Sequence, residues 1–174
     1  MVFWSKGYEG TSLEDLTRAM GINRPSLYAA FGNKESLFRK ALERYVEQWA
    51  GRARRALDLP TAREGVEVLL SEAADAQGHD RPRGCLLVQG ALCCGDEVQP
   101  IRRELAARRF AMEVMLRERF ERARAAGERL PGEPDALARY VSTVLFGMAV
   151  QAAGGAGRED LLPVVDLALR AWSR

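Results

Sequence analysis

Apolar and polar positions follow helical spacing along most of the chain. In residues 37–57 the apolar side chains form one stripe, and no segment shows the strict alternation that is typical of a half-buried strand. Thr61, with Glu64 three residues later, predicts the start of the next helix, because the two residues can cap each other's backbone. We therefore expect an all-α fold. Further helices are predicted at about 100–126, 135–153 and 159–173, with a short apolar segment before Gly95 and loops at 78–84 and 127–135.

The last two predicted helices lack a polar face. Residues 135–153 are apolar nearly all round, and residues 159–173 almost so. A helix of this kind lies either in the centre of a large core or against a partner. Because the chain has only 174 residues, we expect these helices to form the interface of a two-fold homodimer.

The start and stop signals of two short helices follow one another near the N-terminus. The first helix begins behind Thr11 or Ser12, each of which has an acidic residue three positions later, and it ends at Gly21. Asn23 caps the second helix and Gly32 ends it. Two short helices that are joined by a tight, glycine-containing turn form a helix-turn-helix.

The outer face of the second short helix carries mostly small side chains. Small residues let a helix approach base edges closely, and an alanine methyl can meet a thymine methyl. Arg24 alone on this face has the reach for a bidentate contact with guanine, although an arginine can also simply solvate a surface. The face therefore predicts entry into a major groove. The candidates for contact with the groove are Arg24, Pro25, Ser26, Ala29 and Ala30.

Phosphate contacts are expected where helices begin, because free N–H groups at a helix N-terminus bind anions. This favours Thr11 or Ser12 at the first short helix and Lys34 at the long helix that follows. Tyr28 adds a hydroxyl group that could reach the same backbone. Each residue has an alternative role: a cap for Thr11 and Ser12, surface solvation for Lys34, and packing for Tyr28.

The stretch "GYEGTSLEDLTRAMGINRPSLYAAFGNKESLF" resembles the DNA-binding domain of the TetR family of bacterial transcriptional repressors. The turn glycines, the caps, the Leu-Tyr-x-x-Phe spacing and the Lys-Glu helix start all coincide with the pattern of that family. The family usually has a complete first helix preceded by a short basic arm, of which only Val2 to Lys6 precede the motif here. If the first helix is short, an all-helical dimeric interaction protein that no longer binds DNA is the alternative.

The resemblance implies two domains and a repressor mechanism. Residues 1–45 would form the helix-turn-helix DNA-binding domain, and residues 46–174 a helical effector-binding and dimerisation domain. A homodimer would bind double-stranded DNA at an inverted-repeat operator and leave it when an unknown small-molecule effector binds. Apolar residues at helical spacing are also ordinary core residues, which is the alternative for most of the candidate effector contacts. These candidates are Leu86, Gln89, Cys93, Phe110, Met112, Met115, Phe120, Tyr140 and Gln151.

Composition and charge agree with a DNA-binding protein of the cytoplasm. Residues 1–57 contain ten Lys and Arg against six Asp and Glu, whereas residues 58–174 contain sixteen against eighteen. A basic N-terminal part indicates a polyanionic partner. The N-terminus lacks the layout of a signal peptide, and we see no uninterrupted apolar stretch long enough for a bilayer. The hydrophobic content of 47% is ample for a packed core.

The sequence gives little support for thiol sensing, a disulfide, a metal site or catalysis. Cys93 and Cys94 suggest a thiol-sensing regulator, but Asp96 and Glu97 follow them instead of the cations that would lower a thiol pKa. Cys85 and Cys93, if on one helix, are separated by about 12 Å of rise, which is too far for a disulfide. A metal site, a cofactor and an enzyme activity are not expected, because His79 is the only histidine and neither a Cys-His pair nor a phosphate loop occurs.

Overall fold

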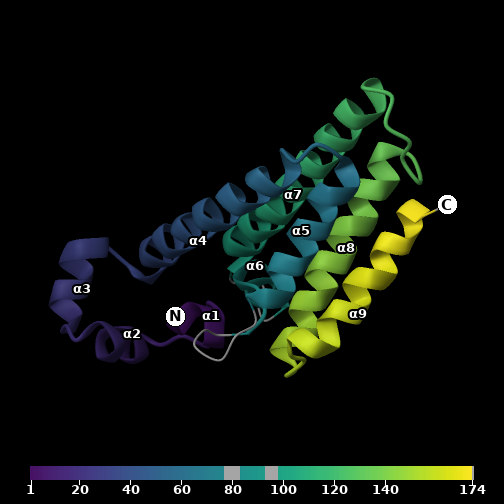
Figure 1. Cartoon of the computed structure of the whole chain (residues 1–174). Coiled ribbons are helices and arrows are strands. Elements are labelled where there is room, and N and C mark those ends of the chain that lie inside the picture. The colour runs from purple at the N-terminus through teal and green to yellow at the C-terminus, as the bar shows by residue number, and fades with distance from the viewer. Residues whose placement is uncertain (77–82, 93–97, 174) are drawn as a thin grey trace.

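The computed structural model of the chain describes residues 1–76, 83–92 and 98–173, and these residues form helices without any strand (Figure 1). The predicted all-α class is confirmed. Gly95 and residues 78–82 of the first expected loop lie outside the described residues, whereas the second expected loop, 127–135, is described in full and connects α7 to α8. The helices are α1 Val2–Lys6, α2 Leu13–Met20, α3 Arg24–Phe31, α4 Lys34–Leu57, α5 Ala62–Asp75, α6 Leu86–Leu92, α7 Gln99–Ala125, α8 Pro134–Ala153 and α9 Arg158–Leu169, followed by a 3₁₀ turn Arg170–Ser173.

Local capping explains where the two short helices α2 and α3 begin and end. Ser12 caps α2 through a reciprocal pair of hydrogen bonds with Asp15, which decides between the two predicted caps. Gly21 ends α2 with a left-handed φ of 65°, a conformation that costs glycine little. The Asn23 side chain accepts from the backbone N–H of Ser26 at the start of α3. The predicted helix-turn-helix is therefore present.

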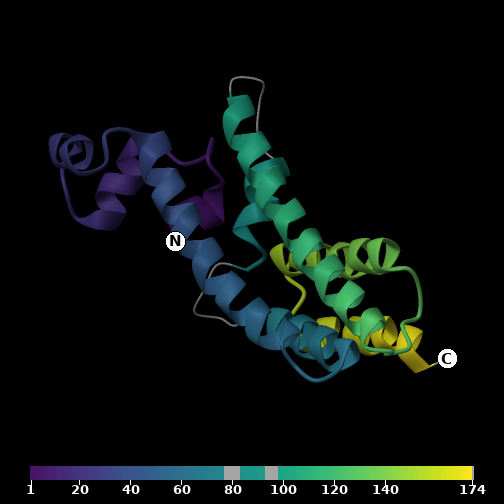
Figure 2. The ribbon, with the colours of Figure 1, turned by 90° about the horizontal axis from the view of Figure 1, so that it is seen from above.

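The long helix α4 connects the helix-turn-helix to the body of the molecule. Helices α2 and α3 lie at the opposite end of the molecule from α9 in both views (Figures 1 and 2). Phe3 of α1 packs against Tyr8 and, edge to face, against Phe38 of α4. The same apolar cluster continues into α6 and α7 through Leu86, Leu87, Ile101 and Leu105. The expected domain boundary after residue 45 thus falls inside α4, at a helix that both parts share.

A second apolar cluster fills the body between α4, α5, α7, α8 and α9. Arg119 of α7 is buried beside it and binds the turn that follows α4. Its Nε donates to the carbonyl oxygen of Leu57 at 2.8 Å, and an Nη atom donates to the carbonyls of Leu59 at 3.1 Å and Pro60 at 3.2 Å. These bonds satisfy carbonyls at the C-terminus of α4 and fix the direction in which α5 leaves it.

Helices α8 and α9 occupy the positions that the sequence predicts, and each exposes apolar side chains. Of the described helices, α8 alone is long and apolar enough to cross a bilayer by length and composition, a property that core helices of soluble proteins share. Its contacts with α7 and α9 bury one side of it. The apolar residues that remain exposed on the two helices include Tyr140, Val150, Val164 and Leu167.

Candidate nucleic-acid interface and internal cavity

Helix α3 exposes the whole face that the sequence assigns to the major groove. Leu27 is fully buried and attaches the helix to the core, while all the proposed groove residues of α3 are exposed. Arg24 is the first residue of α3 and makes no hydrogen bond or ion pair with any described residue. Tyr28 is 45% exposed on the same helix, so its hydroxyl is accessible to a ligand.

The structure separates the two candidates for a phosphate contact at the start of α2. Thr11 is fully buried, and its hydroxyl donates to the carbonyl oxygen of Gly7 at 2.6 Å. The expectation of a phosphate contact by the Thr11 side chain is therefore corrected, because this hydroxyl is committed to the turn beneath α2. Ser12 is exposed, and its hydroxyl accepts a hydrogen bond from the backbone N–H of Asp15.

Lys34 occupies the first turn of α4 and is held against an aromatic ring. Its Nζ lies 4.7 Å from the centre of the Tyr8 ring, which is within the range of a cation–π contact. Burial lowers the pKa of Lys34, and the nearby negative charge of Glu9 opposes that shift. The ammonium group is thus partly positioned rather than fully free in solvent.

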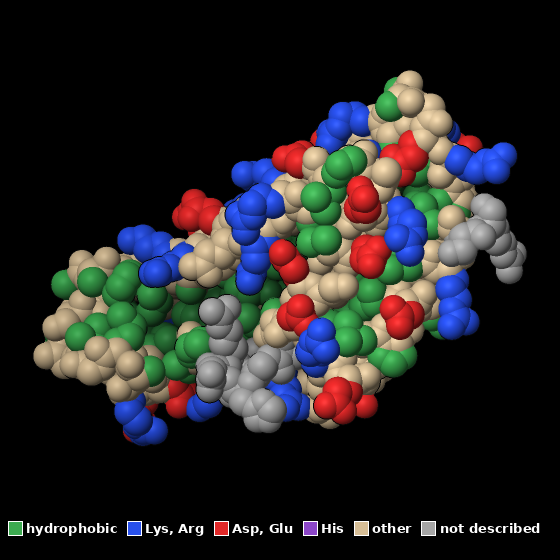
Figure 3. All heavy atoms as spheres, viewed as in Figure 1, with side chains coloured by type: hydrophobic (Ala, Val, Ile, Leu, Met, Phe, Trp, Pro, Cys, Tyr) green, Lys and Arg blue, Asp and Glu red, His purple; other side chains and the backbone are tan. Residues whose placement is uncertain are grey.

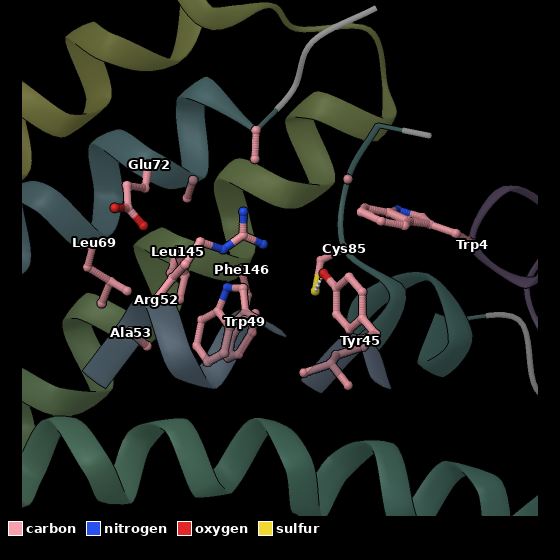
Figure 4. Close-up of a pocket in the computed structure, with 14 residues that line it drawn as sticks. Trp4, Tyr45, Trp49, Arg52, Ala53, Leu69, Glu72, Cys85, Leu145 and Phe146 are labelled. Atoms are coloured by element: carbon pink, nitrogen blue, oxygen red, sulfur yellow. Dashed lines mark hydrogen bonds between the residues drawn. The ribbon is translucent and has the colours of Figure 1, made fainter. Parts of the chain in front are cut away.

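An internal cavity of about 70 Å³ lies between the helix-turn-helix part and the body (Figure 4). Tyr45 of α4 donates a hydrogen bond from its hydroxyl to Cys85 Sγ at 3.2 Å. The ring of Trp4 from α1 packs edge to face on Tyr45, with 5.0 Å between ring centres. The side chains around the cavity therefore come from elements far apart in the sequence. They are Trp4, Tyr45, Trp49, Arg52, Ala53, Leu69, Glu72, Ala73, Ala76, Gly84, Cys85, Leu87, Leu145 and Phe146.

The predicted effector contacts do not come together around this cavity. Leu86, Met112 and Phe120 are buried in the two apolar clusters, and Met115 packs against one of them. Phe110 is 58% exposed in an open groove beside α7 and α8. Tyr140 and Gln151 are exposed on α8, whereas Gln89 donates to the carbonyl of Arg83 at 3.1 Å. Cys93 lies outside the described residues.

Sequence reasoning missed the residues that do line the cavity. Tyr45 and Trp49 are spaced four residues apart on α4 and fit the apolar stripe of that helix, so their pattern is that of ordinary core residues. Arg52, about one turn further along α4, is the sequence feature that could have indicated a ligand site, because it places a cation next to that aromatic pair. Trp4 and Phe146 carry no comparable local signal.

The thiol in the cavity wall is kept in its protonated form. Burial raises the pKa of Cys85, and the hydrogen bond from Tyr45 and the charge of Arg109 offset this only in part. Burial also raises the pKa of Tyr45 well above its ordinary range. Cys93, Cys94 and His79 lie outside the described residues, and in the part of the chain that is described no three His, Cys, Asp or Glu side chains cluster as metal ligands do.

Comparison with known proteins identifies the N-terminal motif and extends over the whole chain. Residues 1–41 match the model of the bacterial regulatory proteins of the tetR family. The HTH-type transcriptional repressor ComR of Escherichia coli (strain K12) is 34% identical over 98% of this chain and 83% of that protein. The HTH-type transcriptional repressor BdcR of the same organism is 30% identical over 97% of this chain and 82% of that protein.

A solved structure agrees with the fold and includes nucleic acid. A cysteine mutant of the TetR family transcriptional regulator CifR, complexed with 26bp double-strand operator DNA, superposes on the chain with a TM-score of 0.92. The two sequences are 46% identical, and the match covers 98% of this chain and 91% of that one.

Proposed function

The chain belongs to the TetR family of DNA-binding transcriptional regulators, and we propose that it is a homodimeric repressor whose operator is released when a small molecule enters the helical body. The family relationship follows from whole-length similarity to repressors and to a regulator bound to operator DNA. Because its task is to bind DNA, we place the protein in the cytoplasm and assign it no catalytic reaction.

The observation that carries this proposal is the exposed face of α3. Capped at its start and anchored by Leu27, the helix presents Arg24, Tyr28 and otherwise small side chains to solvent. A helix with this profile can enter a major groove without a steric barrier. Ser12 and Lys34 flank it at the N-termini of α2 and α4, where they could hold phosphates on either side. Lys and Arg side chains also gather over α4 in Figure 3.

The dimer is proposed from the exposed apolar surface of α8 and α9. Leu167 is 62% exposed, and Val164 lies one turn earlier on α9. A shallow groove between α8 and α9, which contains Val144 and Gln151, runs beside Val164. Two copies of this helix pair would bury these side chains as a four-helix bundle and place two copies of α3 on one DNA duplex.

The effector site is proposed at the internal cavity rather than at the scattered residues that the sequence suggested. Its walls include Trp4 of α1 and Tyr45 of α4, and the other side comes from α5 and α8 of the body. An occupant would therefore contact both the part that carries the helix-turn-helix and the part that forms the dimer. Such a ligand releases DNA only if it binds the DNA-free arrangement more tightly than the DNA-bound one.

The proposed function is tested by fluorescence anisotropy with labelled DNA from upstream of the protein's own gene. Specific binding that weakens steeply as salt rises is expected, since phosphate neutralisation supplies much of the affinity. A shuffled fragment of the same length and base composition is the control. A stable dimer that binds both fragments equally poorly would instead support a helical interaction protein without a DNA-binding role.

A further inference from the structure

An arginine that makes no hydrogen bond or ion pair with the described residues lines the internal cavity. Arg52 is partly buried and makes no hydrogen bond or ion pair with any described residue. In the described part of the chain, the other arginines without such a partner are exposed to solvent. In Figure 4 the side chain of Arg52 extends into the space between Glu72 on one side and the Tyr45–Cys85 pair on the other. A partly desolvated guanidinium group that lacks a hydrogen-bond acceptor can bind a ligand that supplies an acceptor.

A second unsatisfied donor lies in the same wall. The indole Nε1 of Trp4 is buried and has no hydrogen-bond partner. A buried polar group of this kind costs free energy unless a ligand or water satisfies it. The Tyr45 hydroxyl is already committed to Cys85, so the donors that remain available among the described lining residues are Arg52 and the indole N–H groups of Trp4 and Trp49.

The electrostatic balance around the cavity favours a negative charge. Arg52 and Glu72 are the charged residues that line it, and the Glu72 side chain is exposed to solvent, which weakens its repulsion. Arg109 lies close enough to Cys85 to stabilise a negative charge at the thiol. Apolar and aromatic side chains supply most of the remaining wall.

We propose that this cavity binds a compact organic carboxylate, whose carboxylate group pairs with Arg52 and whose apolar part packs against Trp49 and Phe146. The guanidinium fork matches the geometry of a carboxylate, and the indole N–H of Trp4 is a further unsatisfied donor in the cavity wall. A cavity of about 70 Å³ favours a small carboxylate over a long or branched one. The inference rests on the proposed function, in which the occupant of this cavity is the effector.

The test compares benzoate with benzamide, and butyrate with butyramide, because each pair differs in charge and hardly in shape. Binding is followed by tryptophan fluorescence in a Trp172→Phe background, where the remaining tryptophans, Trp4 and Trp49, both line the cavity. At least one carboxylate should bind about tenfold or more tightly than its amide, the effect of one charge-assisted hydrogen bond.

Variants assign the preference to individual side chains. Arg52→Gln should remove the preference for the acid over the amide, whereas Glu72→Gln, which removes the negative charge that the described residues place in the wall, should maintain or increase it. Trp4→Phe keeps an aromatic ring but no N–H, and should weaken carboxylate binding severalfold. Circular dichroism of each variant shows whether the fold is intact.

Two results would overturn the inference: equal binding of acid and amide, or an acid preference that survives in Arg52→Gln. Failure of every carboxylate to bind the wild-type protein would count equally against it. Fluorescence anisotropy of labelled operator DNA, measured on the same preparations with and without the carboxylate, tests the proposed function separately from the ligand class. Carboxylate binding that leaves operator affinity unchanged would support the ligand class and contradict its role as the effector.

Discussion

The hydroxyl of Tyr45 on α4 donates a hydrogen bond to the Sγ of Cys85, 3.2 Å away, at the start of the segment that leads into α6. The bond joins the helix that carries the DNA-binding part to the body, at the wall of the internal cavity. Both groups are buried, and burial raises the pKa of each. At neutral pH the pair therefore consists of a neutral phenol and a neutral thiol.

This pairing predicts that the thiol of Cys85 reacts slowly with alkylating reagents. In a Cys93→Ser/Cys94→Ser background, iodoacetamide should alkylate the folded protein about tenfold or more slowly than the unfolded chain at pH 8, because the thiolate is the nucleophile. Since the folded pKa is raised, the rate should still be climbing at pH values above the ordinary thiol pKa of about 8.5. Equal rates for folded and unfolded protein would contradict the protection of the Cys85 thiol by burial.

Arg119 should contribute strongly to stability, because its guanidinium group bonds to three backbone carbonyls at the end of α4. Replacement of Arg119 by Met would leave these carbonyls without their donor and should lower the free energy of unfolding by about 2–4 kcal/mol. Urea denaturation followed by circular dichroism measures the change. Arg122→Met is the control, since Arg122 is an exposed arginine on the same helix; similar losses in the two variants would rule out a special role for Arg119.

Lys34 should supply affinity without sequence preference. Lys34→Ala is expected to weaken binding to operator and shuffled DNA by similar factors, and to make the salt dependence shallower by about one released counterion per protomer. Anisotropy titrations at several salt concentrations give both quantities. Arg129→Ala removes the same charge from the loop between α7 and α8, far from α3 in Figure 1, and should change neither. A loss confined to the operator would mean that Lys34 reads bases.

Leu167 should be needed for dimerisation. Leu167→Glu places a charge at a side chain that is 62% exposed in one chain, so it should produce folded monomers in light scattering. Val144 is a less suitable target, because it is partly buried against the core and a charge there would also disturb the fold. Ala125→Glu, at an exposed position on α7, is the control for added charge. An intact dimer in Leu167→Glu would remove α9 from the proposed interface.

The helix-turn-helix could be predicted from the sequence because its determinants are local. The caps at Asn23 and Asn33, the turn at Gly21 and the buried Leu27 each act within a few residues of the backbone that they shape. Where two local solutions are equally good, as for capping by Thr11 or Ser12, the sequence does not decide between them. The structure places Thr11 in the core and Ser12 at the cap.

The cavity could not be predicted, because tertiary packing alone brings its walls together. Trp4, Cys85 and Phe146 come from α1, the segment before α6, and α8, and none of them stands out from the core pattern of its own element. The same difficulty explains why the sequence suggests Met112 and Phe120 for a ligand site. Large apolar side chains at helical spacing are equally suited to a core and to a pocket, and here both are buried in the core.

The central claim is that α3 reads base edges through Arg24, and its most direct test is a selection from randomised inverted-repeat operators by the wild type and by Arg24→Ala in parallel. The wild type should return a consensus with one symmetric pair of guanines, and the variant should show no preference at those two positions. Removal of one bidentate arginine–guanine pair should cost about 1–3 kcal/mol, and the substitution removes one such pair from each half-site. A thymine preference nearby should persist, because Ala29 and Ala30 still present their methyl groups to the groove. If both proteins return the same consensus, Arg24 does not read bases and the account of recognition by α3 is wrong.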